Sequence, residues 1–136
     1  MKILLDTNIL LEVILEQEKS DEAQALLAMI EEHEFHISDF SLHSIGVLLF
    51  RNQIQDVFEQ FVEDFINGAG TQIVVLSVED LKDVIDVANE FKLDFDDAYQ
   101  YVASIKFGLS LVSYDHDFDR TEYGRKLPAE IMNPGS

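Results

Sequence analysis

The chain has no cysteine and only two prolines, and each shortage excludes a class of protein or of structure. Without cysteine there are no disulfide frameworks, thiolate metal sites or thiol nucleophiles. Both prolines lie within the last nine residues, so no earlier element is interrupted by proline. No apolar run reaches the roughly 20 residues that a membrane-spanning helix needs, and the first one ends at Asp6, too early for a signal peptide. We therefore expect a cytoplasmic protein that does not associate with a membrane.

Basic residues are also scarce, since nine Lys and Arg accompany 27 Asp and Glu and the net charge is −18. This charge disfavours binding to polyanions such as duplex DNA or an anionic membrane. The deficit is uneven, because residues 101–136 hold four of the nine bases but only five of the 27 acids. Arg120, Arg125 and Lys126 lie within seven residues of one another. This segment is either a solvated loop or the place where the chain contacts phosphate groups.

The 136 residues, 47% of them hydrophobic, are expected to form a single domain over residues 1–136 that buries roughly two-thirds of its unfolded surface. Short apolar runs alternate with helical patterns, and Ser20, Ser77 and Asp94 are predicted to begin helices. The predicted strands are 2–5, 35–38, 73–76 and 109–112. The predicted helices include 20–30, 41–50 and 54–66. This alternation predicts a three-layer α/β/α domain with a mainly parallel central sheet.

Acidic residues stand where the predicted strands end. Asp6 follows the first strand, Asp115 and Asp117 follow the fourth, and Asp96 and Asp97 begin the helix before it. In parallel sheets, functional residues gather at the carboxyl ends of the strands. Carboxylates brought together there repel one another unless a cation lies among them. Because Mg²⁺ and Mn²⁺ prefer oxygen ligands, the pattern predicts a site for one of these ions.

Four motifs, in order along the chain, resemble the PIN-domain family. They are LDTNIL at 5–10, DDA at 96–98, LVSYDHDF at 111–118 and IMNP at 131–134. The likeness is closest to the small VapC-like toxins of toxin–antitoxin pairs. It implies a three-layer PIN-like fold and a ribonuclease that depends on Mg²⁺ or Mn²⁺. It also implies a cognate antitoxin and a homodimer.

The same resemblance assigns roles to particular residues. It implies that Asp6, Asp97 and Asp115 are catalytic metal ligands, with Asp117 as a further ligand. Asn8 and Ser113 would support this cluster, and a metal-activated water would cleave RNA without a side-chain nucleophile.

The chain departs from the family pattern at the second acidic position. Ser44 stands where the family has Glu, on the helix that follows the second strand. Asp39 is near in sequence but lies on a different part of that helix surface. Because a missing carboxylate weakens metal binding, two hypotheses stay open. The chain is either an active ribonuclease or a catalytically degenerate PIN-like domain that binds protein or RNA.

Two predicted helices carry more apolar surface than one face can bury. The segment 45–50 is apolar almost all round, and the next helix has a stripe that includes Phe58, Phe61 and Phe65. We predict that these helices form part of a homodimer or partner surface.

Overall fold

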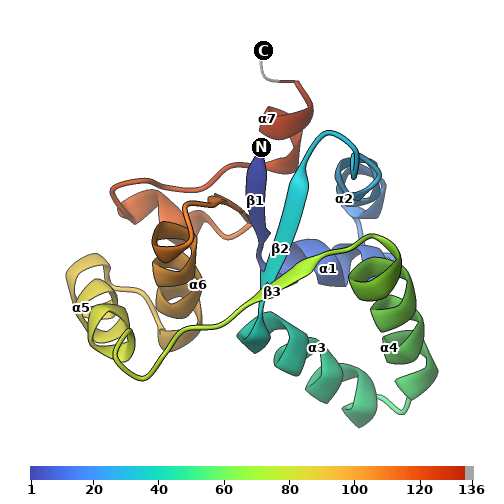
Figure 1. Ribbon diagram of the computed structural model, residues 1–136, viewed down its shortest axis with the longest axis horizontal. Helices are drawn as coiled ribbons and strands as arrows, with labels where there is room; N and C mark the ends of the chain where they lie inside the picture. The colour runs from blue at the N-terminus through green and yellow to red at the C-terminus, as the bar shows by residue number, and fades with distance from the viewer. Residues whose placement is uncertain (134–136) are drawn as a thin grey trace.

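The protein, described by a computed structural model over residues 1–133, is built around a four-stranded parallel sheet (Figure 1). The strands are β1 (Lys2–Leu5), β2 (Glu34–Ser38), β3 (Gln72–Val74) and β4 (Ser110–Val112). Their order is β3-β2-β1-β4, so β1 pairs with β2 on one side and with β4 on the other. The direction of winding therefore reverses between β1 and β4. In open parallel sheets, ligands bind at such a reversal, beyond the carboxyl ends of the strands.

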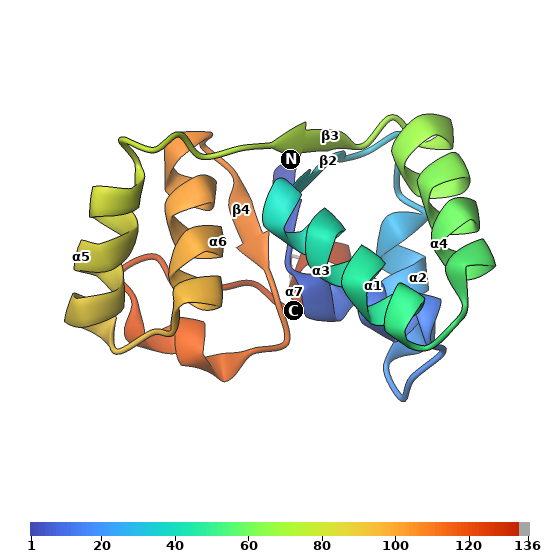
Figure 2. The ribbon, with the colours of Figure 1, turned by 90° about the horizontal axis from the view of Figure 1, so that it is seen from below.

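Helices cover both faces of the sheet, as Figure 2 shows. One face carries α1 (Thr7–Ile14), α2 (Ser20–Leu27), α3 (Asp39–Arg51) and α4 (Gln55–Phe61), and the other carries α5 (Leu81–Phe91) and α6 (Phe95–Lys106). Side chains of β1 alternate between two cores, because Ile3 and Leu5 pack with α1 to α4 while Leu4 packs with α5 and α6. The predicted three-layer α/β/α architecture is confirmed.

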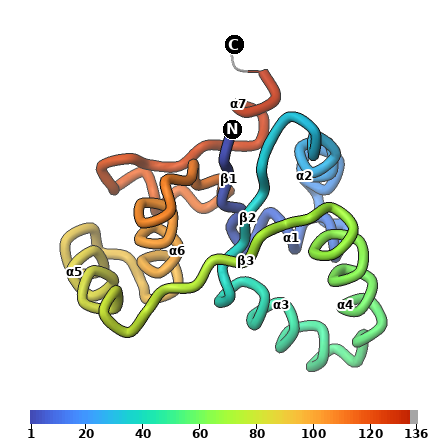
Figure 3. Tube along the Cα trace, in the orientation of Figure 1, coloured from blue at the N-terminus to red at the C-terminus, as the bar shows by residue number. Residues whose placement is uncertain are grey.

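Three shorter elements complete the described chain, namely η1 (Val62–Gly68), η2 (His116–Arg120) and α7 (Pro128–Met132). The π-helical η1 extends α4, after which β3 leads the chain across to α5 on the opposite face (Figure 3). No helix in residues 1–133 is long and apolar enough to span a membrane. Pro134, the last residue of the IMNP motif, lies outside the described residues.

The ends of two predicted helices can be compared with the structure. Asp94 caps α6 as predicted, accepting a hydrogen bond from the Asp97 backbone N–H at 2.9 Å. The prediction that Ser20 caps α2 is wrong, because Ser20 is already helical and its hydroxyl accepts a hydrogen bond from the Gln24 side chain. The predicted helix 20–30 is too long, because α2 ends at Leu27, and Ile30 is 47% exposed.

The turn before α5 shifts the predicted start of this helix. Ser77 was expected to begin the helix, but α5 begins at Leu81 and Asp80 is its N-cap residue. The Asp80 carboxylate accepts hydrogen bonds from the backbone N–H and the hydroxyl of Ser77, at 2.7 and 2.9 Å. Asp80 thus fixes Ser77 through two hydrogen bonds, and α5 begins at Leu81 instead of at Ser77.

Candidate metal centre

Asp6 lies where β1 passes into α1, at the reversal of the sheet. Its extended backbone lets its carboxylate accept a hydrogen bond from the Thr7 backbone N–H at 2.8 Å, so Asp6 is the N-cap of α1. Its own backbone N–H donates to the Val112 carbonyl at 3.0 Å. These bonds fix Asp6 between the carboxyl ends of β1 and β4.

Four donors surround the buried Asp6 carboxylate. Oδ1 accepts from the Thr7 N–H and from Gln100 Nε2, the latter at 3.0 Å. Oδ2 accepts from Ser113 Oγ at 2.7 Å and, over a longer 3.4 Å, from Asn8 Nδ2. Burial raises the pKa of Asp6, although the bonds from Ser113, Gln100 and Thr7 oppose the rise. Several hydrogen bonds therefore hold this one carboxylate in a buried position.

Asp97 brings a second carboxyl group to the site from the first turn of α6. Burial, followed by the charges of Asp115, Asp94 and Asp6 and a hydrogen bond to the Asp115 carboxyl group, raises the pKa of Asp97 to about 8. Mutual repulsion of this kind requires the groups to be close. The structure thus brings Asp6, Asp97 and Asp115 together from three separate elements.

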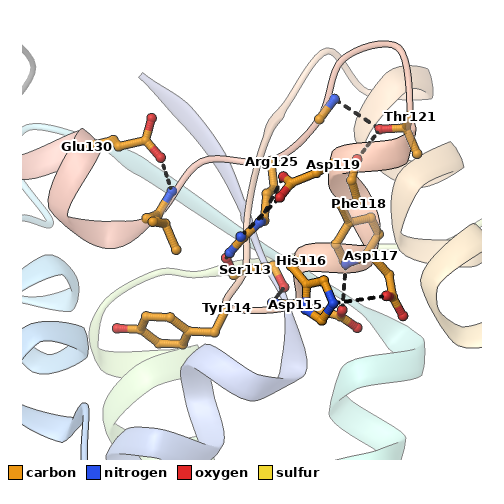
Figure 4. A network of polar contacts seen from close by, with 12 residues as sticks. Ser113, Tyr114, Asp115, His116, Asp117, Phe118, Asp119, Thr121, Arg125 and Glu130 are labelled. Carbon is orange, nitrogen blue, oxygen red and sulfur yellow. Dashed lines mark hydrogen bonds and ion pairs between the residues drawn. The ribbon is translucent and has the colours of Figure 1, made fainter.

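Asp115 also begins η2, where its carboxylate accepts a hydrogen bond from the Asp117 backbone N–H at 2.9 Å (Figure 4). Asp115, His116 and Asp117 offer ligand atoms within 4.8 Å of one another. Asp117 also lies 3.8 Å from His116 Nε2 and 3.6 Å from the Arg120 guanidinium. Asp117 therefore lies beside the exposed imidazole of His116 and guanidinium of Arg120, toward the outside of the cluster.

Asn8 and Ser113 connect the acidic residues with the backbone around them. Asn8 Nδ2 donates to Ser113 Oγ at 3.1 Å, and Asn8 Oδ1 accepts from the Tyr114 N–H at 3.2 Å. The Ser113 hydroxyl donates to Asp6 and accepts from the Asp115 N–H at 2.9 Å. These two residues thus join α1 to the loop that carries Asp115.

The three basic residues of the C-terminal segment have different surroundings. Arg125 donates to both carboxylate oxygens of Asp119, at 3.1 and 3.3 Å, which lowers the pKa of Asp119 (Figure 4). Arg120 lies near Asp117. Lys126 extends β4 through its backbone, and no ion pair involves its side chain among residues 1–133. Of these three basic side chains, that of Lys126 is therefore the most available to a phosphate group.

Sequence reasoning missed Gln100 and Ser41. Gln100 is 1% exposed and donates to Ser41 Oγ at 2.7 Å as well as to Asp6. A signal for Gln100 was present, because it follows Asp97 by three residues and so shares its face of α6. Ser41 gave no comparable signal, since its contact with Gln100 joins residues 59 apart in sequence.

The region of the missing acid contains no substitute carboxylate. Asp39 accepts a hydrogen bond from the Tyr99 hydroxyl at 2.7 Å, and the charges that raise the pKa values of Asp6 and Asp97 come from other residues. Ser44 is half-buried on α3, three residues after Ser41 and hence on the same face. Ser44 thus shares a helix face with Ser41, whose hydroxyl accepts a hydrogen bond from Gln100.

The donor set fits a hard divalent cation. The convergent groups are carboxylate oxygens, and the raised pKa of Asp97 shows that their negative charge is incompletely balanced by the protein. Mg²⁺ and Mn²⁺ would relieve this repulsion and take oxygen ligands by preference. Within residues 1–133, the ligand atoms of Asp115, His116 and Asp117 lie close enough together to hold an ion, and the charges of Asp6 and Asp115 both act on the neighbouring Asp97.

Solved structures of similar fold include three toxin proteins. A toxin–antitoxin complex from Klebsiella pneumoniae is 20% identical with a TM-score of 0.74, covering 93% of this chain and 97% of that one. VapBC2 from Rickettsia felis, bound to promoter DNA, is 17% identical with a TM-score of 0.72 (92% and 96% covered). The sarcin–ricin-loop-cleaving toxin VapC20 of Mycobacterium tuberculosis is 16% identical with a TM-score of 0.74 (93% and 99% covered). At such identities the likeness shows a shared fold.

Family membership is shown by the sequence rather than by the fold. A search of curated proteins finds no match. The family model described as "PIN domain", however, matches residues 3–123, which include the strand-end acids Asp6, Asp97 and Asp115. Together with the parallel β3-β2-β1-β4 sheet and the acidic cluster at its reversal, this match shows that the chain belongs to the PIN-domain family.

Proposed function

We propose that this chain is a ribonuclease that depends on Mg²⁺ or Mn²⁺, held by Asp6, Asp97 and Asp115 with Asp117 at the edge of the site. The observation that carries the proposal is the raised pKa of Asp97, to about 8, at the point where three carboxyl groups converge. Buried carboxyl groups that repel one another stabilise a bound cation at the expense of the empty site. The family membership and the VapC-like fold support the same activity.

The side chains of the cluster would have different roles in this activity. Asp97 would hold a cation as a carboxylate ligand after losing its proton. Asn8 and Ser113 keep Asp6 and the Asp115 loop in place through their hydrogen bonds. A bound divalent cation supplies a Lewis acid for the scissile phosphate and makes a nearby water more acidic. No side-chain nucleophile is needed.

The substrate is RNA, single-stranded or structured, as expected from the family. A chain with a net charge of −18 attracts such a polyanion weakly at long range, so contacts near the site must position it. Of the three bases, Arg120 lies next to the cluster, 3.6 Å from Asp117, while Arg125 pairs with Asp119 and Lys126 forms no ion pair within residues 1–133.

An antitoxin is the proposed regulatory partner. The similar structures from Klebsiella pneumoniae and Rickettsia felis are described as a toxin–antitoxin complex and as VapBC2 on promoter DNA. By analogy, a cognate antitoxin would bind this chain in the cytoplasm and restrain its activity.

We also propose a homodimer that uses α3 and α4. Part of the apolar surface expected there is buried within the chain, because Phe58 contacts Gly46 and the rings of Phe58, Phe61 and Phe65 stack in succession. Phe50, however, remains 55% exposed beside a cavity of about 800 Å³ that α3 and α4 line. This remaining surface suits a second copy of the chain.

The second candidate function is a degenerate PIN-like domain that binds RNA or protein without cleavage. Ser44 favours it, since one carboxylate of the family pattern is missing from α3. A ribonuclease would hydrolyse RNA and would need Asp6 to do so, whereas the degenerate domain would bind RNA or protein without hydrolysing it.

An RNA cleavage assay separates them. Wild-type protein and Asp6→Ala would be incubated with single-stranded RNA, with Mn²⁺ and with a chelator. A nuclease cleaves only with Mn²⁺ and only when Asp6 is present. RNA binding without cleavage by either protein would favour the degenerate domain, and cleavage that persists in Asp6→Ala would point to a contaminating enzyme.

A further inference from the structure

Gln100 is a fully buried polar residue that contacts the acidic cluster from α6. It is 1% exposed, and its two amide hydrogens are used in bonds to Asp6 Oδ1 at 3.0 Å and to Ser41 Oγ at 2.7 Å. Asp6 directly follows β1 and caps α1, and Ser41 lies in the first turn of α3, three residues after the end of β2. Gln100 therefore links three elements at the site.

The carbonyl oxygen of the Gln100 amide differs from its nitrogen in its hydrogen bonding. Gln100 Oε1 is buried and accepts no hydrogen bond from any residue within 1–133. An unpaired buried acceptor destabilises a protein, whereas Leu or Met would fill similar space without that cost. The structure thus retains an amide here for its donor group, and the donor is directed at Asp6.

Ser41 holds the amide from the other side. Its hydroxyl oxygen accepts from Gln100 and from Ser38 Oγ at 3.3 Å, so both lone pairs are occupied. The Ser41 hydroxyl must then donate to Thr7 Oγ1, which lies 2.8 Å away. This chain of hydrogen bonds leaves the Gln100 amide with one orientation.

The two oxygens of Asp6 differ as a result. Oδ1 accepts two short bonds, from Thr7 and Gln100, which occupy both of its lone pairs. Oδ2 has one short bond, from Ser113, and one of 3.4 Å from Asn8. The weak Asn8 bond is the one that a cation displaces most easily, because Asn8 keeps its bond to Ser113 Oγ.

We propose that Gln100 is a positioning residue of the metal centre, which fixes the plane of the Asp6 carboxylate and leaves Oδ2 as the oxygen that faces the cation. This inference rests on the proposed function but has a consequence that can be observed without metal. Removing the amide leaves Oδ1 with the Thr7 bond alone, so the Asp6 carboxylate can rotate about that bond.

The test compares Gln100→Leu with Gln60→Leu. Gln60 is a matched control, because its amide also donates to an Asp carboxylate, Asp64, at 2.8 Å on the exposed surface of α4 and η1. Gln100→Met, which keeps an unbranched side chain, is the second variant in case Gln100→Leu does not fold. Crystal structures without metal, melting temperatures and calorimetric titrations with Mn²⁺ are the measurements.

We expect the Asp6 carboxylate to adopt a different orientation in Gln100→Leu and the Kd for Mn²⁺ to rise by about 10-fold or more. In Gln60→Leu both should match the wild type. A purely structural role would change the melting temperature alone, and an unchanged Asp6 with a Kd within twofold of the wild type would overturn the proposal. If the wild type binds no Mn²⁺, the proposed function fails, and the orientation of Asp6 in the metal-free structures still decides the role of Gln100.

Discussion

Asp97 connects the charge of the acidic cluster with the stability of the fold. Its pKa is raised from 3.8 to about 8, first by burial and then by the charges of Asp115, Asp94 and Asp6. Between these pH values the folded state holds a proton that the unfolded state has lost. The free energy of unfolding therefore falls as the pH rises through this window.

We predict that Asp97→Asn removes this dependence. One pKa unit corresponds to about 1.4 kcal/mol, and water at the edge of the cluster screens part of the repulsion, so the variant should be more stable than the wild type at pH 8 by at least about 1 kcal/mol. Urea unfolding at pH 5 and pH 8 measures this, with the exposed Asp56→Asn as control. Equal losses of stability in the wild type and Asp97→Asn between the two pH values would contradict the prediction.

Ser44 gives the second residue-scale prediction. Ser44→Glu places a carboxylate on the face of α3 that also carries Ser41, so the variant should bind Mn²⁺ about 10-fold more tightly and cleave RNA faster. Ser44→Gln is the control, since it has the same length without the charge. A destabilised Ser44→Glu that gains no affinity for Mn²⁺ would instead show that a buried Glu has no partner there and would favour the degenerate domain.

Sequence patterns located the acidic residues of the site but not their surroundings. Asp6, Asp97 and Asp115 could be identified because each stands at a strand end or in a first helical turn, where short-range patterns are informative. The bonds that join Gln100 to Asp6 and to Ser41 span 94 and 59 residues. Such contacts depend on strand order, which hydrophobic periodicity does not specify.

At the scale of elements, α3 and α4 carry the proposed dimer surface. Exchanging the half-exposed Phe50 for Glu introduces a charge into an apolar contact, so Phe50→Glu should be a monomer under conditions where the wild type has twice the 15.5 kDa chain mass. Light scattering over a range of concentrations measures both species. Val78→Glu, at an 80% exposed residue before α5, is the control. A wild type that stays monomeric at high concentration would rule out the dimer.

Element types were easier to predict than element boundaries. The strand runs and the helix that begins after Asp94 were found because apolar periodicity and an N-cap agree there. Ser20 and Ser77 resembled caps in sequence, but the N-cap residues of their helices are Lys19 and Asp80. The predicted helix 54–66 continues to Gly68 as η1, whose wider turns do not follow the 3.6-residue period used to predict it.

At the scale of the whole molecule, the candidate site lies at the carboxyl ends of two adjacent strands, β1 and β4. The order β3-β2-β1-β4 places the ends of β1 and β4 side by side, and α6 returns over them with Asp97. Carboxyl groups far apart in sequence meet there, in a chain whose net charge of −18 offers few cations of its own. The account therefore depends on whether this site binds a divalent cation.

Calorimetric titration of the wild type with Mn²⁺ at pH 7, paired with melting curves, tests that claim most directly. We predict binding that releases protons, because Asp97 is protonated before the ion arrives, and a melting temperature that rises with Mn²⁺ concentration. Asp97→Asn should lose both effects, while Asp56→Asn should keep them. A wild type with no binding heat and an unchanged melting curve in millimolar Mn²⁺ would contradict the account.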